Sequence, residues 1–298
     1  MTHISVLKKE VLDFLAPQEN ENFIDATGGG GGHTLEILKR NGPKGRVLCL
    51  DLDREALGRI KEKIAVENPA DLERLILTEG NFADLKKIVQ EKNFENISGI
   101  LADLGLSSNQ LKESGRGFSF LKEEKLDMRF SKNSDLTAEK IVNEWSEEKI
   151  EEILKKFGEE KFSQRISKEI CRQRLLKKIE TTDDLIKIIA CALPSKFRRG
   201  HLHFATKTFQ ALRIAVNDEI KNLEKFLPQA LAVLENEGRL VVISFHSLED
   251  RIVKIFFKEA NKSGKIEILT KKPIKPLFEE TKNNPRSRSA KLRAIFKK

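Results

Sequence analysis

Short, continuous apolar segments alternate with segments of helical periodicity through the first hundred residues, and this alternation constrains the fold more than any other feature of the chain. We expect strands at 22–26, 46–52, 75–78 and 97–104, and helices between them at 34–40, 55–66 and 84–91. Alternating strands and helices are typical of a parallel, doubly wound sheet. Because the apolar runs are continuous, both faces of the sheet should be covered. The sequence therefore predicts an α/β fold.

A helical region interrupts this alternation in the middle of the chain. Between 137 and 193 the pattern is helical, and Ser146 and Thr182 are the expected N-caps of two of its helices. The earlier pattern then resumes, with expected helices at 207–226 and 228–235, a strand at 240–245, and two final strands, antiparallel at the sheet edge, at 266–270 and 291–296. We therefore predict an α/β domain made of 1–110 and 206–298, with an inserted helical domain at 111–205.

Composition excludes several classes of protein. No stretch approaches the roughly 18 consecutive apolar residues of a membrane span, and residues 1–17 lack the apolar segment of a signal peptide. We therefore expect a cytoplasmic protein. The three cysteines, Cys49, Cys171 and Cys191, are far apart and form no CxxC motif, so we expect neither a disulfide framework nor a zinc knuckle.

The positive charge is concentrated at one end of the chain. The net charge is +9, and residues 251–298 alone carry 15 Lys and Arg against 4 Asp and Glu. A localised basic segment on an otherwise nearly neutral chain indicates a polyanionic partner. A solvated basic tail without a partner is the alternative that composition alone leaves open.

Five consecutive glycines, Gly28 to Gly32, follow the first expected strand and open a helix. Glycine is required where the backbone approaches a ligand closely or adopts a positive φ. A phosphate-binding P-loop would need Lys-Ser/Thr where this chain has His33-Thr34. A dinucleotide fingerprint starting at Gly28 would need glycine at His33. A methyltransferase loop tolerates the pattern, because its ligand has no pyrophosphate; a merely flexible loop is the other alternative.

Carboxylates and one aromatic residue follow the other expected strands. Asp51 ends the second strand, 19 positions after Gly32, where a carboxylate can accept both hydroxyls of a ribose; a turn-forming Asp is the alternative. Phe82 follows the third strand, where it could lie against an adenine or belong to the core. Asp103 leaves the fourth strand, where a Rossmann-like methyltransferase places a group facing cofactor and substrate; a helix cap is the alternative.

Polar residues also gather in two later segments. Asn217, Asp218, His246 and Asp250 are candidates either for catalysis or for fixing loops. A Ser–His–Asp hydrolase is disfavoured because the chain has no GxSxG elbow. His201-x-His203 has no further metal-ligand cluster nearby, so we expect no metal and interpret this segment, with Arg198 and Arg199, as a basic loop facing RNA.

Together these segments resemble the bacterial 16S rRNA (cytosine-N4) methyltransferase family, RsmH/MraW. The resemblance includes Asp-Leu-Gly-x-Ser-Ser-x-Gln at 103–110, Thr-x-Thr-Phe-Gln-Ala-Leu-Arg-Ile-Ala-Val-Asn-Asp-Glu at 206–219 and Val-Ile-Ser-Phe-His-Ser-Leu-Glu-Asp-Arg-Ile-Val-Lys at 242–254. Shorter matches lie at 31–33, 51, 115–120 and 126–129, and a longer one at 284–293. These segments occur in order from one end of the chain to the other, and the long ones are highly specific.

The resemblance implies a Rossmann-like class I S-adenosylmethionine methyltransferase whose inserted helical domain recognises the substrate. The implied substrate is the P-site cytosine of 16S rRNA in the decoding centre of the small ribosomal subunit. A homodimer is one option that the sequence leaves open. By carry-over, the residues that line the cofactor are Gly31, Gly32, His33, Asp51, Phe82, Asp103 and Gln110.

Within this hypothesis, Asp103 is the candidate acceptor of the N4 proton, and Phe118, Phe120 or Phe245 the candidate stacking partner of the base. The chain departs from the family pattern at Asn109 and Phe204, which are usually Pro, and at Lys207, which is usually Arg. The departures bear on RNA contacts and leave the cofactor residues intact. Two rival classes are an NAD-dependent oxidoreductase and an RNA-binding assembly factor with a vestigial pocket.

Overall fold

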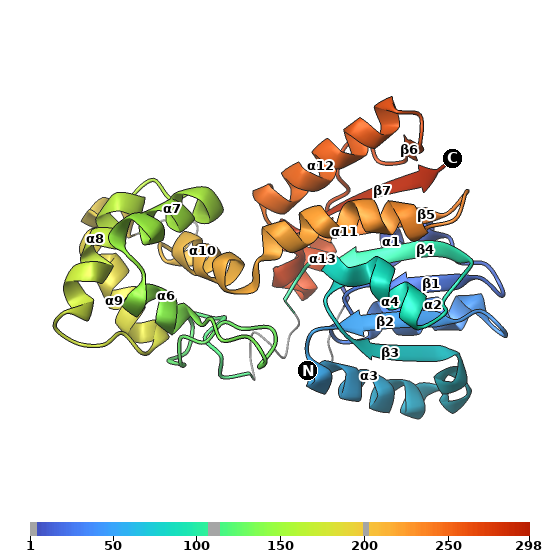
Figure 1. The fold of residues 1–298 in the computed structure, drawn as a ribbon, viewed down its shortest axis with the longest axis horizontal. Coiled ribbons are helices and arrows are strands. Elements are labelled where there is room, and N and C mark those ends of the chain that lie inside the picture. Colours follow the sequence, from blue (N-terminus) through green and yellow to red (C-terminus); the bar gives the residue numbers. More distant parts are fainter. Residues whose placement is uncertain (1–4, 107–113, 199–202) are drawn as a thin grey trace. The chain divides into compact units, whose positions relative to one another are not determined.

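The computed structural model describes residues 5–106, 114–198 and 203–298. The chain divides into two compact units, one made of Met1–Ser107 with Ile220–Lys298, the other of Ser108–Glu219. We call them the α/β unit and the helical unit (Figure 1). The second boundary lies after Glu219 and not at the predicted 205/206, because helix α10 (Thr206–Asn217) packs against α7 (Glu147–Gly158) of the helical unit.

The α/β unit contains a seven-stranded sheet in the order β3-β2-β1-β4-β5-β7-β6. Its strands are β1 (Asn22–Asp25), β2 (Val47–Asp51), β3 (Leu75–Glu79), β4 (Ile97–Asp103), β5 (Arg239–Ser244), β6 (Ile266–Ile268) and β7 (Lys291–Lys297). The first five are parallel, whereas β7 is antiparallel to both β5 and β6. The structure thus confirms the predicted parallel sheet and the antiparallel pair at its edge.

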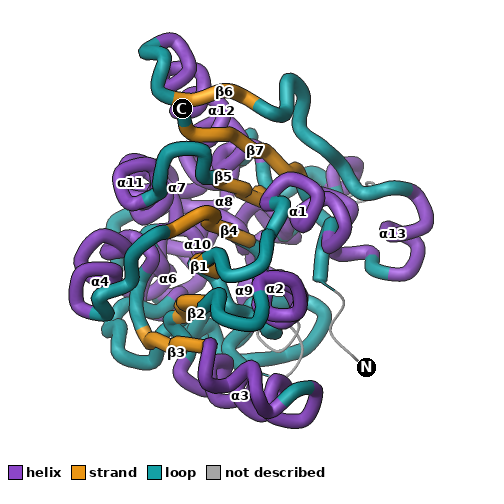
Figure 2. Tube along the Cα trace, turned by 90° about the vertical axis from the view of Figure 1, so that its right-hand side faces the viewer, coloured by secondary structure: helices purple, strands orange, loops and turns teal. Residues whose placement is uncertain are grey.

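Helices cover both faces of the sheet, as the continuous apolar strands predict. They are α1 (Lys8–Leu15), α2 (Gly32–Asn41), α3 (Arg54–Glu67), α4 (Leu85–Glu91), α11 (Glu219–Val233) and α12 (Ser247–Lys262), whereas the short α13 (Phe278–Asn283) has no buried residue and covers neither face. Successive strand residues point to opposite faces: Leu48 joins a core with residues of α4, α11 and α12, whereas Val47 joins a core with residues of α1, α2 and α3. Figure 2 shows α1 and α2 on one side of the strands and α4 and α11 on the other.

The chain between 206 and 235 differs from the prediction of helices at 207–226 and 228–235. The helices instead break at Asp218, whose backbone is left-handed with φ 51°, and α11 then continues through Pro228. A proline removes one intrahelical hydrogen bond. That loss is tolerated here because Pro228 lies on the exposed face of α11.

The helical unit is built from α6 (Ala138–Glu144), α7, α8 (Ser163–Arg174), α9 (Thr182–Ala192) and α10. Ser146 caps α7 by accepting a hydrogen bond from the Lys149 amide, as predicted. The cap of α9 is Thr181 rather than the predicted Thr182, because Thr181 exchanges hydrogen bonds with Asp184 in a capping box. No helix among the described residues is both long and apolar enough to cross a membrane.

Candidate active site

Three carboxylates end three neighbouring strands at one edge of the sheet. Asp25 ends β1, Asp51 ends β2 and Asp103 ends β4. The strand order reverses between β1 and β4, which are paired neighbours although other strands separate them in sequence. Doubly wound sheets bind ligands outside the carboxyl ends of their strands at such a reversal. The fold therefore brings the predicted Asp51 and Asp103 to the expected ligand edge.

The glycine run between β1 and α2 lies tightly against β2 and α3. The Gly28 amide donates to the Leu50 carbonyl at 2.6 Å, and the Gly29 amide donates to Asp51 Oδ2 at 2.8 Å. A Cβ added at Gly28 would lie 2.7 Å from Cys49 Sγ. At Gly31, where φ is 70°, a Cβ would lie 2.9 Å from Ile60 Cγ1. These positions need glycine for close packing and for a left-handed backbone, so this is a built loop and not merely a flexible one.

The Asp51 carboxylate accepts two hydrogen bonds and can accept more. Its Oδ2 accepts from Gly29 and its Oδ1 accepts from the Asp53 amide at 2.8 Å. An ionised carboxylate offers about four lone-pair positions, so further donors can bind. Burial raises the pKa of Asp51 above its ordinary value. The carboxylate is therefore a suitable acceptor for two vicinal hydroxyl groups.

Asp25 begins the sequence segment that contains the glycine run, but it is not one of the predicted cofactor residues, and the structure shows it as a buried member of the site. Thr34 Oγ1 donates to Asp25 Oδ2 at 2.6 Å, and the Thr27 amide donates to Asp25 Oδ1 at 3.2 Å. Burial raises the pKa of Asp25 to about 7. Its two bonds fix the start of the glycine loop and the first turn of α2, so Asp25 shapes the loop. Its place at the end of the first strand, three residues before Gly28, was the signal that could have identified it.

Asp103 connects the glycine loop to the end of β4. Its amide donates to Thr27 Oγ1 at 2.7 Å, and its Oδ2 lies 3.7 Å from His33 Nε2. Burial raises the pKa of Asp103 to about 7, and the Asp25 carboxyl adds to this shift. His33 is itself buried in the first turn of α2. The structure thus places the predicted His33 and Asp103 side by side, with the carboxyl group poised to gain or lose a proton near neutral pH.

The remaining predicted cofactor residues, Gly32, Phe82 and Gln110, differ in their surroundings. Gly32 opens α2, close to Ser5, whose Oγ would lie 1.9 Å from an added Cβ. Phe82 lies in the short helix η2 (Phe82–Asp84) after β3, half-buried, with its ring edge-to-face against Phe226 at 5.2 Å. Gln110 falls outside the described residues.

Most of the later polar candidates fix loops and helix ends. His246 caps α12 in a capping box with Glu249. Asp250 accepts from Arg293 Nε at 2.7 Å and so ties α12 to β7, and Arg293 lowers its pKa. Asn217 Oδ1 accepts from the Phe130 amide at 2.8 Å, within the helical unit. Lys207 donates to the Glu159 carbonyl at 2.8 Å beyond the end of α7. These contacts are structural and do not involve the strand-end carboxylates.

The three candidate stacking residues have different surroundings. Phe245 follows β5 and lies against Gly105, where an added Cβ would be 2.6 Å from the ring. In the helical unit, Phe118 is buried and stacks on Phe130, and Phe120 stacks on His203. Phe245 is therefore the aromatic candidate within the α/β unit that lies beside the loop following Asp103.

The set of carboxyl groups fits S-adenosylmethionine better than a dinucleotide. Three carboxyl groups converge on the glycine loop, and each has a raised pKa because of burial. Such an environment favours a cationic or neutral ligand and opposes the two negative charges of a pyrophosphate. A sulfonium cation and a ribose are compatible with it. The electrostatics of the site thus disfavour the NAD-dependent rival.

A family model described as the MraW methylase family matches residues 1–298. The chain belongs to this family. It is therefore an S-adenosylmethionine-dependent methyltransferase, as the resemblance implied. A relative named Ribosomal RNA small subunit methyltransferase H from Thermosipho melanesiensis is 49% identical, covering 98% of this chain and 96% of its own length. A protein of the same name from Clostridium botulinum (strain Kyoto) is 44% identical, covering 99% and 98%.

A solved structure of a candidate rRNA methylase from Clostridium thermocellum has a similar fold. The TM-score is 0.50 at 14% identity, with 99% of each chain covered. This likeness concerns the fold alone, and it agrees with the Rossmann-like arrangement of the α/β unit.

Proposed function

We propose that this methyltransferase transfers a methyl group from S-adenosylmethionine to the N4 amine of the P-site cytosine of 16S rRNA in the small ribosomal subunit. The observation that carries the proposal is the group of relatives named Ribosomal RNA small subunit methyltransferase H, which are 43–49% identical over nearly the whole chain. An rRNA substrate would place the protein in the cytoplasm. Monomer and homodimer are both compatible with the proposal, and sedimentation would distinguish them.

We propose that the cofactor binds at the carboxyl ends of β1, β2 and β4. The residues proposed to hold it are Gly31, Gly32, His33, Asp51, Phe82, Asp103 and Gln110. Asp51, with two acceptor positions already used by backbone amides, would accept the ribose hydroxyls. The bound cofactor supplies a methyl group that is already activated by the sulfonium charge.

The chemical task left to the protein is to make a poor nucleophile reactive. The lone pair of the cytosine N4 amine is delocalised into the ring, and an acceptor for one N4–H bond would localise it. Asp103 Oδ2 is the proposed acceptor and would then take the proton. A carboxyl group with a pKa of about 7 is well suited to accept a proton near neutral pH.

The target base must leave its stack to reach a group in the sheet edge. Phe245, which lies against Gly105 beside the loop following Asp103, is the proposed stacking partner for the extruded ring. Stacking of this kind contributes about 1–3 kcal/mol per base. The helical unit is proposed to recognise the surrounding RNA.

The experiment that tests this function is transfer of labelled methyl from S-adenosylmethionine to small subunits that lack the modification, followed by nucleoside analysis. We expect label in N4-methylcytidine with the wild-type protein and its loss with Asp103→Ala, at unchanged folding. Label in another nucleoside would refute the N4 assignment. Binding of the cofactor without transfer to subunits would favour the assembly-factor alternative.

A further inference from the structure

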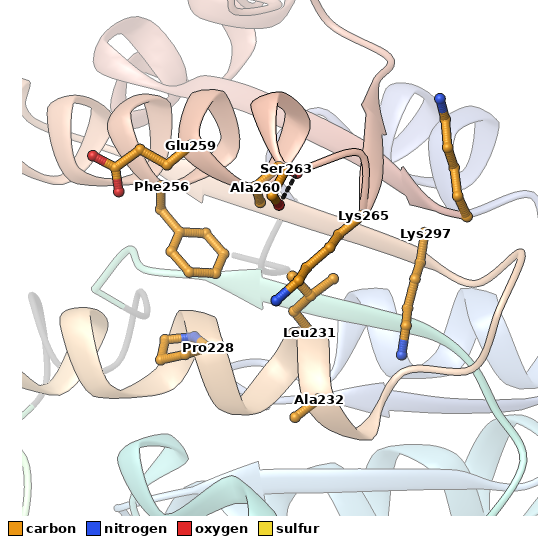
Figure 3. Close-up of a pocket in the computed structure, with 10 residues that line it drawn as sticks. Pro228, Leu231, Ala232, Phe256, Glu259, Ala260, Ser263, Lys265 and Lys297 are labelled. Atoms are coloured by element: carbon orange, nitrogen blue, oxygen red, sulfur yellow. Dashed lines mark hydrogen bonds between the residues drawn. The ribbon is translucent and has the colours of Figure 1, made fainter.

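An apolar groove lies in the α/β unit between α11 and α12, away from the strand-end carboxylates. It has a volume of about 570 Å³ and is lined by Pro228, Leu231 and Phe256, among others. Figure 3 shows the ring of Phe256 extending from α12 toward Pro228 of α11. Ligand pockets typically measure about 300–1,000 Å³, so the groove can accept a group the size of a nucleobase.

Lysines surround one end of this groove. Lys265, Lys297 and Lys298 line it, and Glu259 is the one carboxylate among its lining residues. Lys297 donates to the carbonyl of Leu234 at the end of α11. Lys265 is exposed and forms no ion pair with any residue of the described part of the chain. The groove therefore combines an apolar floor with a cationic end.

A row of exposed lysines continues from this end along α12. Lys254, Lys258 and Lys262 are spaced four residues apart and are all exposed, so they lie on one face of the helix about 6 Å apart along its axis. We call them the lysine ridge. None of them pairs with a carboxylate among the described residues. Ile255, on the same face, is 48% exposed.

The direction of α12 gives the ridge its relation to the active site. The helix begins at Ser247, directly after the carboxyl end of β5, and runs to Lys262. Lys297 lies at the other end of the sheet, because β7 is antiparallel to β5 and Phe296 pairs with Arg239. The ridge thus leads from the edge that carries the cofactor residues toward the cationic end of the groove.

We propose that the lysine ridge and the α11–α12 groove form a binding surface for a single-stranded segment of the rRNA, with phosphates on the ridge and an unpaired base in the groove against Phe256. Uncompensated cations in a row match a polyanion. The groove opens on another side of α12, because its lining residues Phe256 and Ala260 are each two residues from Lys258, and the lysines reach the groove at the end of the helix, where Lys262 is followed by Lys265. The apolar, aromatic lining of the groove matches the face of a base. The inference rests on the proposed function, since it assigns a second contact to the same RNA substrate.

The test compares charge-neutralising variants that remove the same net charge. The ridge variant is Lys254→Gln/Lys258→Gln/Lys262→Gln, and the matched control replaces the exposed Lys61, Lys86 and Lys92 by Gln. Binding of unmodified small subunits and of a short single-stranded oligoribonucleotide is measured by filter retention at several salt concentrations. Methyl transfer to subunits and S-adenosylmethionine affinity are measured in parallel.

We expect the ridge variant to bind at least tenfold more weakly and its log–log salt slope to fall by about 2, since each phosphate contact on a single strand contributes about 0.7. The control should retain wild-type affinity and slope, and both variants should retain cofactor affinity. Equal binding by the ridge and control variants would overturn the assignment of the ridge. Absence of transfer by the wild type, with the binding difference intact, would refute the proposed function and leave the surface in place.

The groove is tested separately by filling it. Ala232 is exposed on α11 and lines the groove, so Ala232→Glu places a negative charge there without disturbing the core, and Ala232→Gln is the neutral control of similar size. Phe256→Leu removes the stacking plane while keeping an apolar side chain. We expect about tenfold weaker oligoribonucleotide binding for Ala232→Glu and Phe256→Leu. Unchanged affinity for single strands, or an equal loss for duplex RNA, would show that no base enters the groove.

Discussion

Replacing Gly31 by alanine should destabilise the α/β unit through two separable effects. The backbone at Gly31 has φ 70°, which costs an L-residue about 1–2 kcal/mol. The new methyl group would also lie 2.9 Å from Cγ1 and 3.2 Å from Cγ2 of Ile60. Ile60 is 1% exposed and cannot move aside freely, so overpacking should add about 1–3 kcal/mol. We therefore expect a loss of about 2–5 kcal/mol in the free energy of unfolding, with weaker cofactor binding.

A double-mutant cycle with Ile60→Ala separates the two effects. Ile60→Ala alone should cost about 2–5 kcal/mol through the cavity that it creates. In the double variant the overpacking disappears, so the total loss should fall short of the sum by about 1–3 kcal/mol. Gly58→Ala, also in α3 but with no atom within 4 Å of the added methyl group, should instead stabilise by about 1 kcal/mol.

Equilibrium unfolding in urea measures all four variants, and calorimetry measures their affinity for S-adenosylmethionine. Strictly additive losses in the cycle would refute the contact between the glycine loop and α3. A Gly31→Ala variant as stable as the wild type would refute both the contact and the strained backbone.

Three further predictions concern single side chains. Asp51→Asn should weaken S-adenosylmethionine binding about 10- to 100-fold, because a hydrogen bond to a charged group contributes about 1.5–3 kcal/mol. Glu91→Gln, at an exposed position, should leave this binding unchanged. Equal calorimetric affinities of the two variants for the cofactor would contradict the assignment of Asp51 to the ribose. Because the proposed proton acceptor must be ionised, kcat/KM should rise with pH up to the pKa of Asp103, about 7, and then level off. Asp103→Asn should lower kcat/KM at least about 100-fold and abolish this pH dependence. A flat wild-type profile would argue against Asp103 as the proton acceptor. Asn217→Ala should cost about 2–3 kcal/mol in urea unfolding, because Asn217 bonds to the Phe130 amide and the Met128 carbonyl; a loss under about 0.5 kcal/mol would show that these bonds do not hold that loop.

The sheet could be predicted because burial on both faces requires continuous apolar runs in its strands. Strand residues such as Val47 and Leu48 pack into different cores, so apolar residues occupy consecutive positions. The break at Asp218 could not be predicted, because a left-handed Asp lies between two helices of similar periodicity. Pro228 led to the opposite error, because the sequence predicted a break between two helices beside it. Pro228 instead lies inside α11 on its exposed face, where the loss of one intrahelical hydrogen bond is tolerated.

The separate motifs of the site could be predicted from the sequence, but the spatial arrangement of their side chains could not. The position of Asp51 after an apolar strand indicates a ligand-facing carboxylate, but the 3.7 Å approach of His33 to Asp103 depends on strand order. The bond between Asp250 and Arg293 likewise joins residues far apart in the chain. Such pairings are set by tertiary packing, so sequence left the roles of the later polar residues open.

Locating the methyl group within the RNA tests the proposed activity. Small subunits that lack the modification are incubated with S-adenosylmethionine and either wild-type protein or Asp103→Asn, and ribonuclease fragments of the 16S rRNA are analysed by mass spectrometry. We predict one added methyl group in the fragment that contains the P-site cytosine, located on N4, with the wild type and not with the variant. A methyl group in any other fragment, or on another atom of that cytosine, would contradict this prediction.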